Sequence, residues 1–146
     1  MVELALVIVI IGVLGAIAGP RLFNNSTFDE RAYYDELVTS IRYAQKVAVA
    51  SGCRVQLDIT ATTYSLSQQA LQAGHCDPAD ASFPVPVRLP SGEIMNGSAP
   101  GGITAAPAII FVYEPLGRTN LAANQMLTVG SRTLTIQAES GLVVTP

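Results

Sequence analysis

Residues 1–23, MVELALVIVIIGVLGAIAGPRLF, decide how the rest of the chain is interpreted. From Leu4 to Pro20 there are seventeen residues without a charge, and the only charge ahead of them is Glu3. A membrane-spanning helix needs about 17–25 apolar residues. A secretory signal peptide would begin with a basic region, whereas here Glu3 leads directly into the apolar run. The stretch therefore predicts an apolar helix that continues into the protein.

A second, amphipathic helix is predicted after this run. Gly52 is placed to end it with a left-handed cap, and Pro20 is expected to kink the chain between the two helical parts. A continuous helix over residues 3–52 would be about 75 Å long, so half of it must lie in a membrane or against other copies. Apolar residues recur in steps of three and four along one face, at Tyr34, Leu37, Val38, Ile41, Ala44, Val47 and Ala48.

After Gly52 the apolar period changes to two, which predicts a β-hairpin. Residues 55–59 alternate as a half-buried strand, and Tyr64 and Leu66 resume the alternation after a polar turn. The second strand returns beside Cys53, and Cys76 follows a few residues later. A disulfide between them is expected to contribute about 3 kcal/mol. The alternative is a pair of buried free thiols.

The remaining residues predict further strands of an antiparallel sheet. Residues 74–107 are rich in loops, with an edge strand at 85–89, and residues 108–113 are expected to form a buried central strand. Residues 126–138 form a hairpin with a turn at Gly130-Ser131, and residues 142–144 close the sheet. The predicted fold is α+β, a long helix packed on an antiparallel sheet. We expect a helix at 1–23 and a head at 24–146, made of helix 24–52 and sheet 53–146.

Composition and motifs argue against an enzyme. The 146 residues carry eleven acids and eight bases, a net charge of −3, which does not suit a general nucleic-acid binder. The single histidine, His75, is next to Cys76, and adjacent side chains on an extended chain point apart. Asp77 and Asp80 would add too few ligands for a firm metal site. The glycines form no phosphate loop. We therefore expect no catalytic residue, cofactor or metal.

The first 23 residues resemble the N-terminal segment of type IV pilins and type II secretion pseudopilins. In that family a basic leader ends in glycine and precedes phenylalanine, threonine, two apolar residues, glutamate and an apolar helix with a proline near its end. Met1-Val2-Glu3-Leu4 matches the last part of this pattern, and Pro20 matches the proline. The leader, its glycine and the two residues after it are not in this sequence.

This resemblance implies a role in assembly for Glu3 and Pro20. The helix would first lie in the inner membrane with the head in the periplasm, and subunits would then pack into a fibre. The Glu3 carboxylate would pair with the N-terminal amine of a neighbouring subunit; the alternative is a solvated residue at the membrane interface. The implied partners are other pilin or pseudopilin subunits, membrane lipid and the inner-membrane assembly platform. For a chain with a leader, the resemblance also implies cleavage by the prepilin peptidase and methylation of the N-terminus.

Two further stretches suggest a subfamily. Residues 110–118, IFVYEPLGR, resemble the strand and turn of H-type minor pseudopilins, the GspH/FimT-like class, and the Cys53–Cys76 pair is similar to minor pilins of mannose-sensitive haemagglutinin (MSHA) systems. The resemblance implies a minor subunit of a pilus or secretion pseudopilus, in its initiating or tip complex.

Two alternatives to this role remain. The first is a DNA-binding minor pilin for natural transformation. Some DNA-uptake members carry Gly-Arg-x-Arg near their C-terminus, but the matching residues 141–144 are GLVV, so DNA is an unlikely partner on this reading. Arg118 and Arg132 remain as isolated bases, which we interpret as solvated. The second alternative is a single-span anchored domain of unrelated function.

Overall fold

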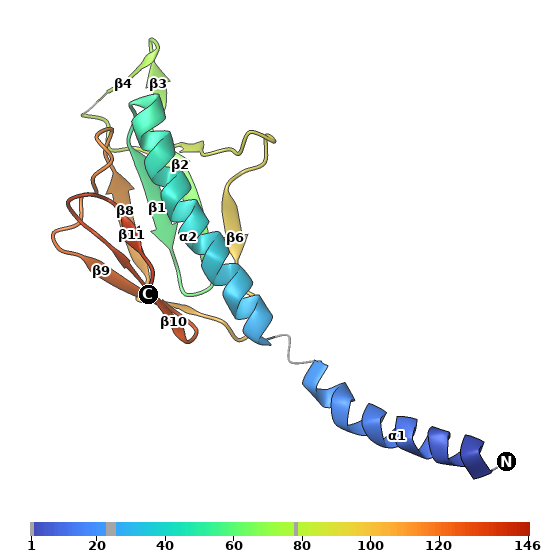
Figure 1. Cartoon of the computed structure of the whole chain (residues 1–146). Helices are drawn as coiled ribbons and strands as arrows, with labels where there is room; N and C mark the ends of the chain where they lie inside the picture. Colours follow the sequence, from blue (N-terminus) through green and yellow to red (C-terminus); the bar gives the residue numbers. More distant parts are fainter. Residues whose placement is uncertain (1, 23–25, 78) are drawn as a thin grey trace.

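The computed structural model describes residues 2–22, 26–77 and 79–146, with only the backbone for residues 14–22. Two helices come first, α1 (Val2–Leu22) and α2 (Ser26–Ser51). The two predicted helical parts are confirmed. Their junction, residues 23–25, lies outside the described residues, and Pro20 lies inside α1, near its end. In Figure 1, α1 extends away from the rest of the chain.

Helix α2 places one face in the core, as its period predicts. The face includes Tyr34, Leu37, Val38, Ile41, Ala44 and Ala48, while Val47 is only partly buried. Tyr33 also lies in this core, at 1% exposure, although the pattern did not include it. The helix ends as predicted, because Gly52 has a φ of 68° and its N–H donates to the Ala48 carbonyl at 3.0 Å.

The first sheet lies against α2. It contains β1 (Val55–Ile59), β2 (Thr63–Gln68), β5 (Val85–Pro86), β6 (Asn96–Ser98) and β8 (Ile109–Tyr113), and its path is β5-β2-β1-β8 with β6 also on β2. The predicted hairpin is confirmed, since Leu57 pairs with Leu66 and both are buried. The predicted edge strand is present at Val85–Pro86, whereas β6 forms where the sequence predicted only a loop.

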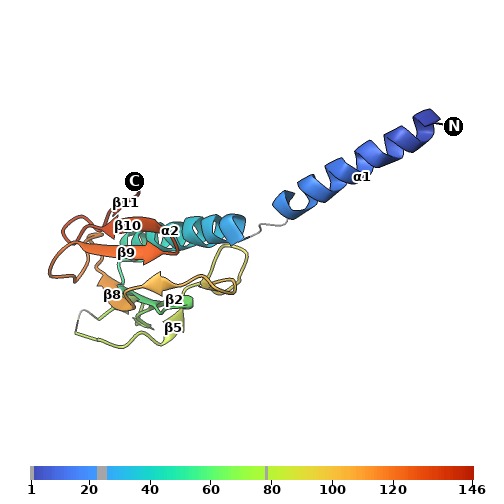
Figure 2. The same ribbon diagram turned by 90° about the horizontal axis from the view of Figure 1, so that it is seen from below.

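A second sheet was not predicted. It contains β7 (Ala105–Ala106), β9 (Gln125–Val129), β10 (Arg132–Ile136) and β11 (Val143–Val144), in the order β11-β10-β9-β7. The hairpin around Gly130-Ser131 is confirmed within it. Figure 2 shows this sheet on the opposite side of the head from β2 and β5. A short pair, β3 (Leu71–Gln72) and β4 (His75–Cys76), stands apart at one end (Figure 1).

The prediction that residues 108–113 form a central strand is wrong. Strand β8 is the last strand of the first sheet and pairs along its length only with β1. On its other edge, the Asn120 side chain accepts from the Val112 N–H at 2.8 Å and the Asn120 N–H donates to the Val112 carbonyl at 3.0 Å. The chain therefore covers part of this edge with a loop, and Ile110 is 61% exposed. The strands of the second sheet, β7 before β8 and β9 to β11 after it, do not pair with β8, so the one predicted sheet is in fact two.

Candidate functional site

Helix α1 carries an unusual amount of exposed apolar surface. The large apolar side chains described on it are exposed by 49% at Ile10 up to 81% at Val2. They cover every side of the helix rather than one stripe: Val2, Leu4, Leu6, Val7, Ile8, Val9, Ile10, Ile11 and Val13. A helix that is apolar all round is stable only when lipid or protein surrounds it. The described head does not supply that cover.

Glu3 is the acidic residue of the first turn of α1, and its side chain is exposed. The N-terminus of a helix has a partial positive charge, so a carboxylate is stabilised there. The structure thus places Glu3 at the far end of α1, next to the exposed apolar residues Val2 and Leu4. Pro20, the other residue expected to act in assembly, lies near the opposite end of the same helix. Within the residues whose side chains are described, the structure contains no helix with both the length and the apolarity needed to cross a membrane.

Cys53 and Cys76 form the expected disulfide, so the alternative of two free thiols does not apply. Their Cα atoms are 5.3 Å apart, and Cys53 is buried just after the end of α2. Cys76 lies in β4, opposite Leu71 of β3. The bond therefore ties the β3–β4 hairpin to the end of the long helix, at the end of the head away from α1 (Figure 1).

Gln69 holds the same region from inside, a role that the sequence did not reveal. Its side chain is 2% exposed, and its carbonyl oxygen accepts from the Arg54 N–H at 2.9 Å. Its amide donates to the Asp77 carbonyl at 3.0 Å and to the Asp80 carbonyl. A buried amide needs partners for both of its polar ends, and Gln69 has them. The loop after Cys76 is thus held by a disulfide and by a buried side chain.

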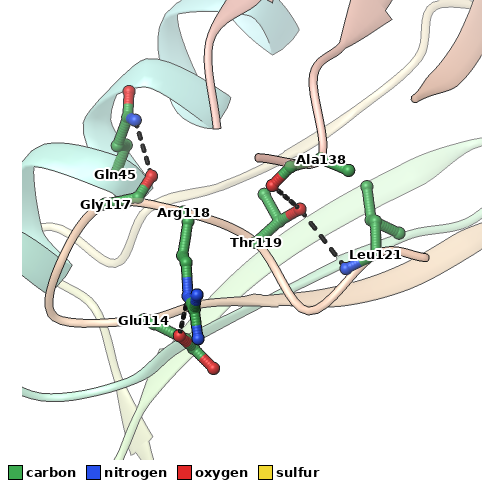
Figure 3. A network of polar contacts seen from close by, with 7 residues as sticks. All are labelled: Gln45, Glu114, Gly117, Arg118, Thr119, Leu121 and Ala138. Atoms are coloured by element: carbon green, nitrogen blue, oxygen red, sulfur yellow. Dashed lines mark hydrogen bonds and ion pairs between the residues drawn. The ribbon is translucent and has the colours of Figure 1, made fainter. Parts of the chain in front are cut away.

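Hydrogen bonds join the turn after β8 to α2 (Figure 3). The Gln45 amide donates to the Gly117 carbonyl at 2.7 Å and to the Ser140 carbonyl at 2.8 Å. Arg118 pairs with Glu114 at 2.6 Å. Beyond the turn, the Thr119 hydroxyl donates to the Ala138 carbonyl at 2.9 Å. Residues 114–119, which include the end of the stretch that resembles minor pseudopilins, therefore connect helix α2 with both sheets.

Tyr113, at the end of β8, also links the first sheet to the second, from inside the core. Its ring is buried, and its hydroxyl donates to the Gly141 carbonyl at 2.9 Å. Burial raises the pKa of Tyr113 well above its usual value, so the hydroxyl remains a donor. Gly141 has a φ of 67°, and a Cβ there would lie 2.2 Å from the Gly117 carbonyl oxygen. The close contact between the two turns thus requires a glycine at 141.

The residues considered as possible metal ligands or DNA-binding bases show no such site in the described structure. The Asp80 carboxylate accepts from the Ser82 N–H and hydroxyl, which lowers the pKa of Asp80. No group of three potential metal ligands occurs among the described residues, which include His75 and Asp77. The prediction that Arg132 is an isolated base is wrong, because its guanidinium lies 5.7 Å from the centre of the Tyr34 ring.

Comparisons with known proteins identify the fold. No protein-family model matches the chain, and no curated protein matches it. Two crystal structures of the type IV minor pilin FimU from Pseudomonas aeruginosa are similar, with TM-scores of 0.59 and 0.55 and sequence identities of 14% and 15%. They cover 84% and 80% of this chain, and the similarity covers 91% of each FimU chain. The chain therefore has the α+β fold of this minor pilin, an N-terminal helix packed on antiparallel sheets.

Proposed function

We propose that the chain is a minor pilin or pseudopilin, a structural subunit and not an enzyme. Residues 1–23 insert in the inner membrane, residues 24–146 form a periplasmic head, and the subunit then enters a type IV pilus or a secretion pseudopilus. Its place is in the initiating or tip complex, beside other minor subunits. The resemblance of residues 110–118 to H-type pseudopilins and of the cysteine pair to MSHA minor pilins supports a minor subunit of this kind.

The observation that carries this proposal is the exposed apolar surface of α1 joined to a head with the fold of FimU. Burying apolar surface stabilises a protein by about 25 cal/mol per Å², so side chains such as Val2 and Leu4 favour any environment that covers them. A membrane covers them before assembly, and the α1 helices of neighbouring subunits cover them in a fibre. The head has its own core and needs neither environment.

Glu3 gives this packing a fixed register. An unpaired carboxylate inside an apolar fibre is costly, whereas one that meets the N-terminal amine of a neighbouring subunit is compensated. Only one axial position of the helices allows this pairing. The exposure of Glu3 in the first turn of α1 is compatible with a partner from another chain. Pro20 serves the same assembly by allowing α1 to bend near the head.

Expression with a complete assembly system tests this proposal. The chain, placed behind a leader peptide, is coexpressed with a prepilin peptidase, an assembly platform and the other subunits of a pilus or pseudopilus system. We expect cleavage of the leader and recovery of the chain with sheared filaments or with copurified minor subunits. A chain that is inserted in the membrane but neither cleaved nor copurified with any pilin subunit would show that the proposed function is wrong.

A further inference from the structure

Two small cavities meet at the end of the head that carries β3 and β4. The first, of about 280 Å³, lies between the end of α2, β4 and the turn after β8. The second, of about 270 Å³, lies beside β8, where Val112 and Phe83 are among its lining residues. Arg54 and Glu114 line both cavities. The two cavities therefore form one groove, here called the end groove, with Arg54 and Glu114 between its halves.

Exposed apolar side chains surround the first cavity. Leu116 lines it and is 86% exposed, more than any large apolar side chain described on α1. Leu71, also exposed, pairs across β3 and β4 with Cys76, another lining residue. Exposed Val49 of α2 is next to the same turn, since a Cβ on Gly117 would lie 3.2 Å from its side chain. Three elements thus present apolar surface around one cavity, which is typical of a binding site.

The walls of the end groove are held in place. The Gln69 side chain accepts from the Arg54 N–H at 2.9 Å, and the Gln69 N–H donates to the Arg54 carbonyl at 3.2 Å. The disulfide between Cys53 and Cys76 fixes β4 against the end of α2, and Gln45 holds the turn at Gly117. A ligand would therefore find the groove already formed, and little affinity would be lost in ordering it.

Arg54 is the cation of the end groove that is left for a ligand. It is half-buried and has no ion pair among the described residues. Glu114 is the only carboxylate among the described residues that line the two cavities, and it pairs with Arg118 at 2.6 Å (Figure 3). Glu114 above all, and also Glu139, raise the pKa of Arg118, so the charge of Arg118 is balanced. A half-buried guanidinium without a partner is suited to a carboxylate, which can accept two of its N–H groups.

We propose that the end groove binds an extended peptide segment of another protein, whose Asp or Glu side chain pairs with Arg54. In an extended chain, side chains two residues apart point the same way and are about 6.6 Å apart. An acid held by Arg54 between the cavities would therefore direct the side chains two residues before and after it into the two halves of the groove. The preferred segment is apolar-x-acid-x-apolar.

Other anionic partners fit the end groove less well. A nucleic acid is held by several cations at once, whereas Arg54 is the one unpaired cation among the described residues that line this groove. The exposed Leu116 would also have no apolar counterpart on a phosphate backbone. The groove belongs to the head and does not involve α1, so this inference goes beyond the proposed function and does not rest on it.

The test selects ligands from a phage library of random linear peptides, with the full chain in detergent micelles as the target. The displayed peptides are fused at their C-terminus, so they have no free terminal carboxylate. The variant R54Q removes the cation, and L116S removes the exposed apolar wall. The controls K46Q and M126S make the same kinds of change at residues that line neither cavity. Circular dichroism and urea unfolding establish that each variant is folded.

We expect the selected peptides to be enriched in the apolar-x-acid-x-apolar pattern. A synthetic copy with both ends blocked should bind R54Q about tenfold more weakly than the native chain, in fluorescence anisotropy. Asparagine or glutamine in place of the peptide's acid should cause the same loss, and both changes together no more than either alone, because they break one pair. L116S should also bind more weakly, whereas K46Q and M126S should bind like the native chain.

Three results would overturn the inference. The first is the absence of enriched peptides, or equal binding by the native chain, R54Q and L116S. The second is a loss for R54Q that adds fully to the loss from removing the peptide's acid, since Arg54 would then not hold that acid. The third is a synthetic peptide that binds only with a free C-terminus, because the groove would then recognise a chain end. None of these measurements involves a filament, so each result leaves the pilin proposal to its own test.

Discussion

The side-chain amide of Gln45 lies 2.7 Å from the Gly117 carbonyl oxygen and donates a hydrogen bond to it. The same nitrogen donates to the Ser140 carbonyl at 2.8 Å. Gly117 follows the last strand of the first sheet, and Ser140 lies between two strands of the second sheet. One side chain of α2 thus joins the helix to both sheets.

Replacing Gln45 is therefore expected to destabilise the head more than replacing an exposed glutamine would. Gln45→Ala removes the donor from two carbonyls, and we expect the free energy of unfolding to fall by about 2 kcal/mol. Gln45→Glu should destabilise at least as much at neutral pH, because a carboxylate would face two carbonyl oxygens. Urea unfolding followed by circular dichroism measures both changes. The control is Gln72→Ala, at an exposed position of β3; equal losses for Q45A and Q72A would contradict this role of Gln45.

Removing the disulfide is expected to loosen one end of the head. The cysteines are 23 residues apart in sequence, and for a closed loop of this size the double variant C53S/C76S should lose about 3 kcal/mol. Amide hydrogen exchange should rise most in β3 and β4, which the bond ties to α2, and least in β9 and β10. The outcome that would speak against this is uniform exchange across the head with no change in unfolding midpoint.

Glu30 gives the head an acid-sensitive contact between α2 and the β9–β10 turn. Its carboxylate accepts from the Ser131 hydroxyl at 2.5 Å and from the Ser131 N–H at 3.0 Å, and these bonds lower the pKa of Glu30. A group whose pKa is lowered on folding stabilises the protein above its unfolded pKa, about 4.3. That contribution disappears as the pH falls through the folded pKa.

The measurement for Glu30 is the urea midpoint from about pH 6 to about pH 3. Glu30→Gln does not titrate, so its midpoint should fall less with acid than that of the native chain, and the two should converge at low pH. Ser131→Ala removes the hydroxyl but keeps the N–H, so its acid dependence should lie between the two. Parallel curves for all three proteins would show that Glu30 does not couple α2 to this turn.

The sequence predicted most elements of the fold because their patterns are local. Steps of three and four located the buried face of α2, and alternation located the β1–β2 hairpin around Leu57 and Leu66. Which strands pair across the molecule is not local. The apolar run of β8 indicated a central strand, yet only β1 pairs along it, and the strands of the second sheet pair with one another instead.

The functional features also differ in whether the sequence alone reveals them. Glu3 and the apolar residues of α1 were apparent from the sequence, because an isolated charge beside a long apolar run is visible without a fold. Gln45 and Gln69 were not, because their partners at Gly117 and Asp77 are set by tertiary structure.

The most direct test of the central claim compares Glu3→Val with the native chain in a system that assembles filaments. Both chains carry a leader, and the amount of each in sheared filaments is divided by its amount in the membrane. We expect both to insert, since Val suits an apolar helix, but E3V should be recovered in filaments at about one tenth of the native ratio or less, because it lacks the carboxylate that sets the register. Equal filament recovery of E3V and the native chain would contradict the account, because Glu3 would then not set the register, and absence of both from filaments would favour an anchored domain of unrelated function.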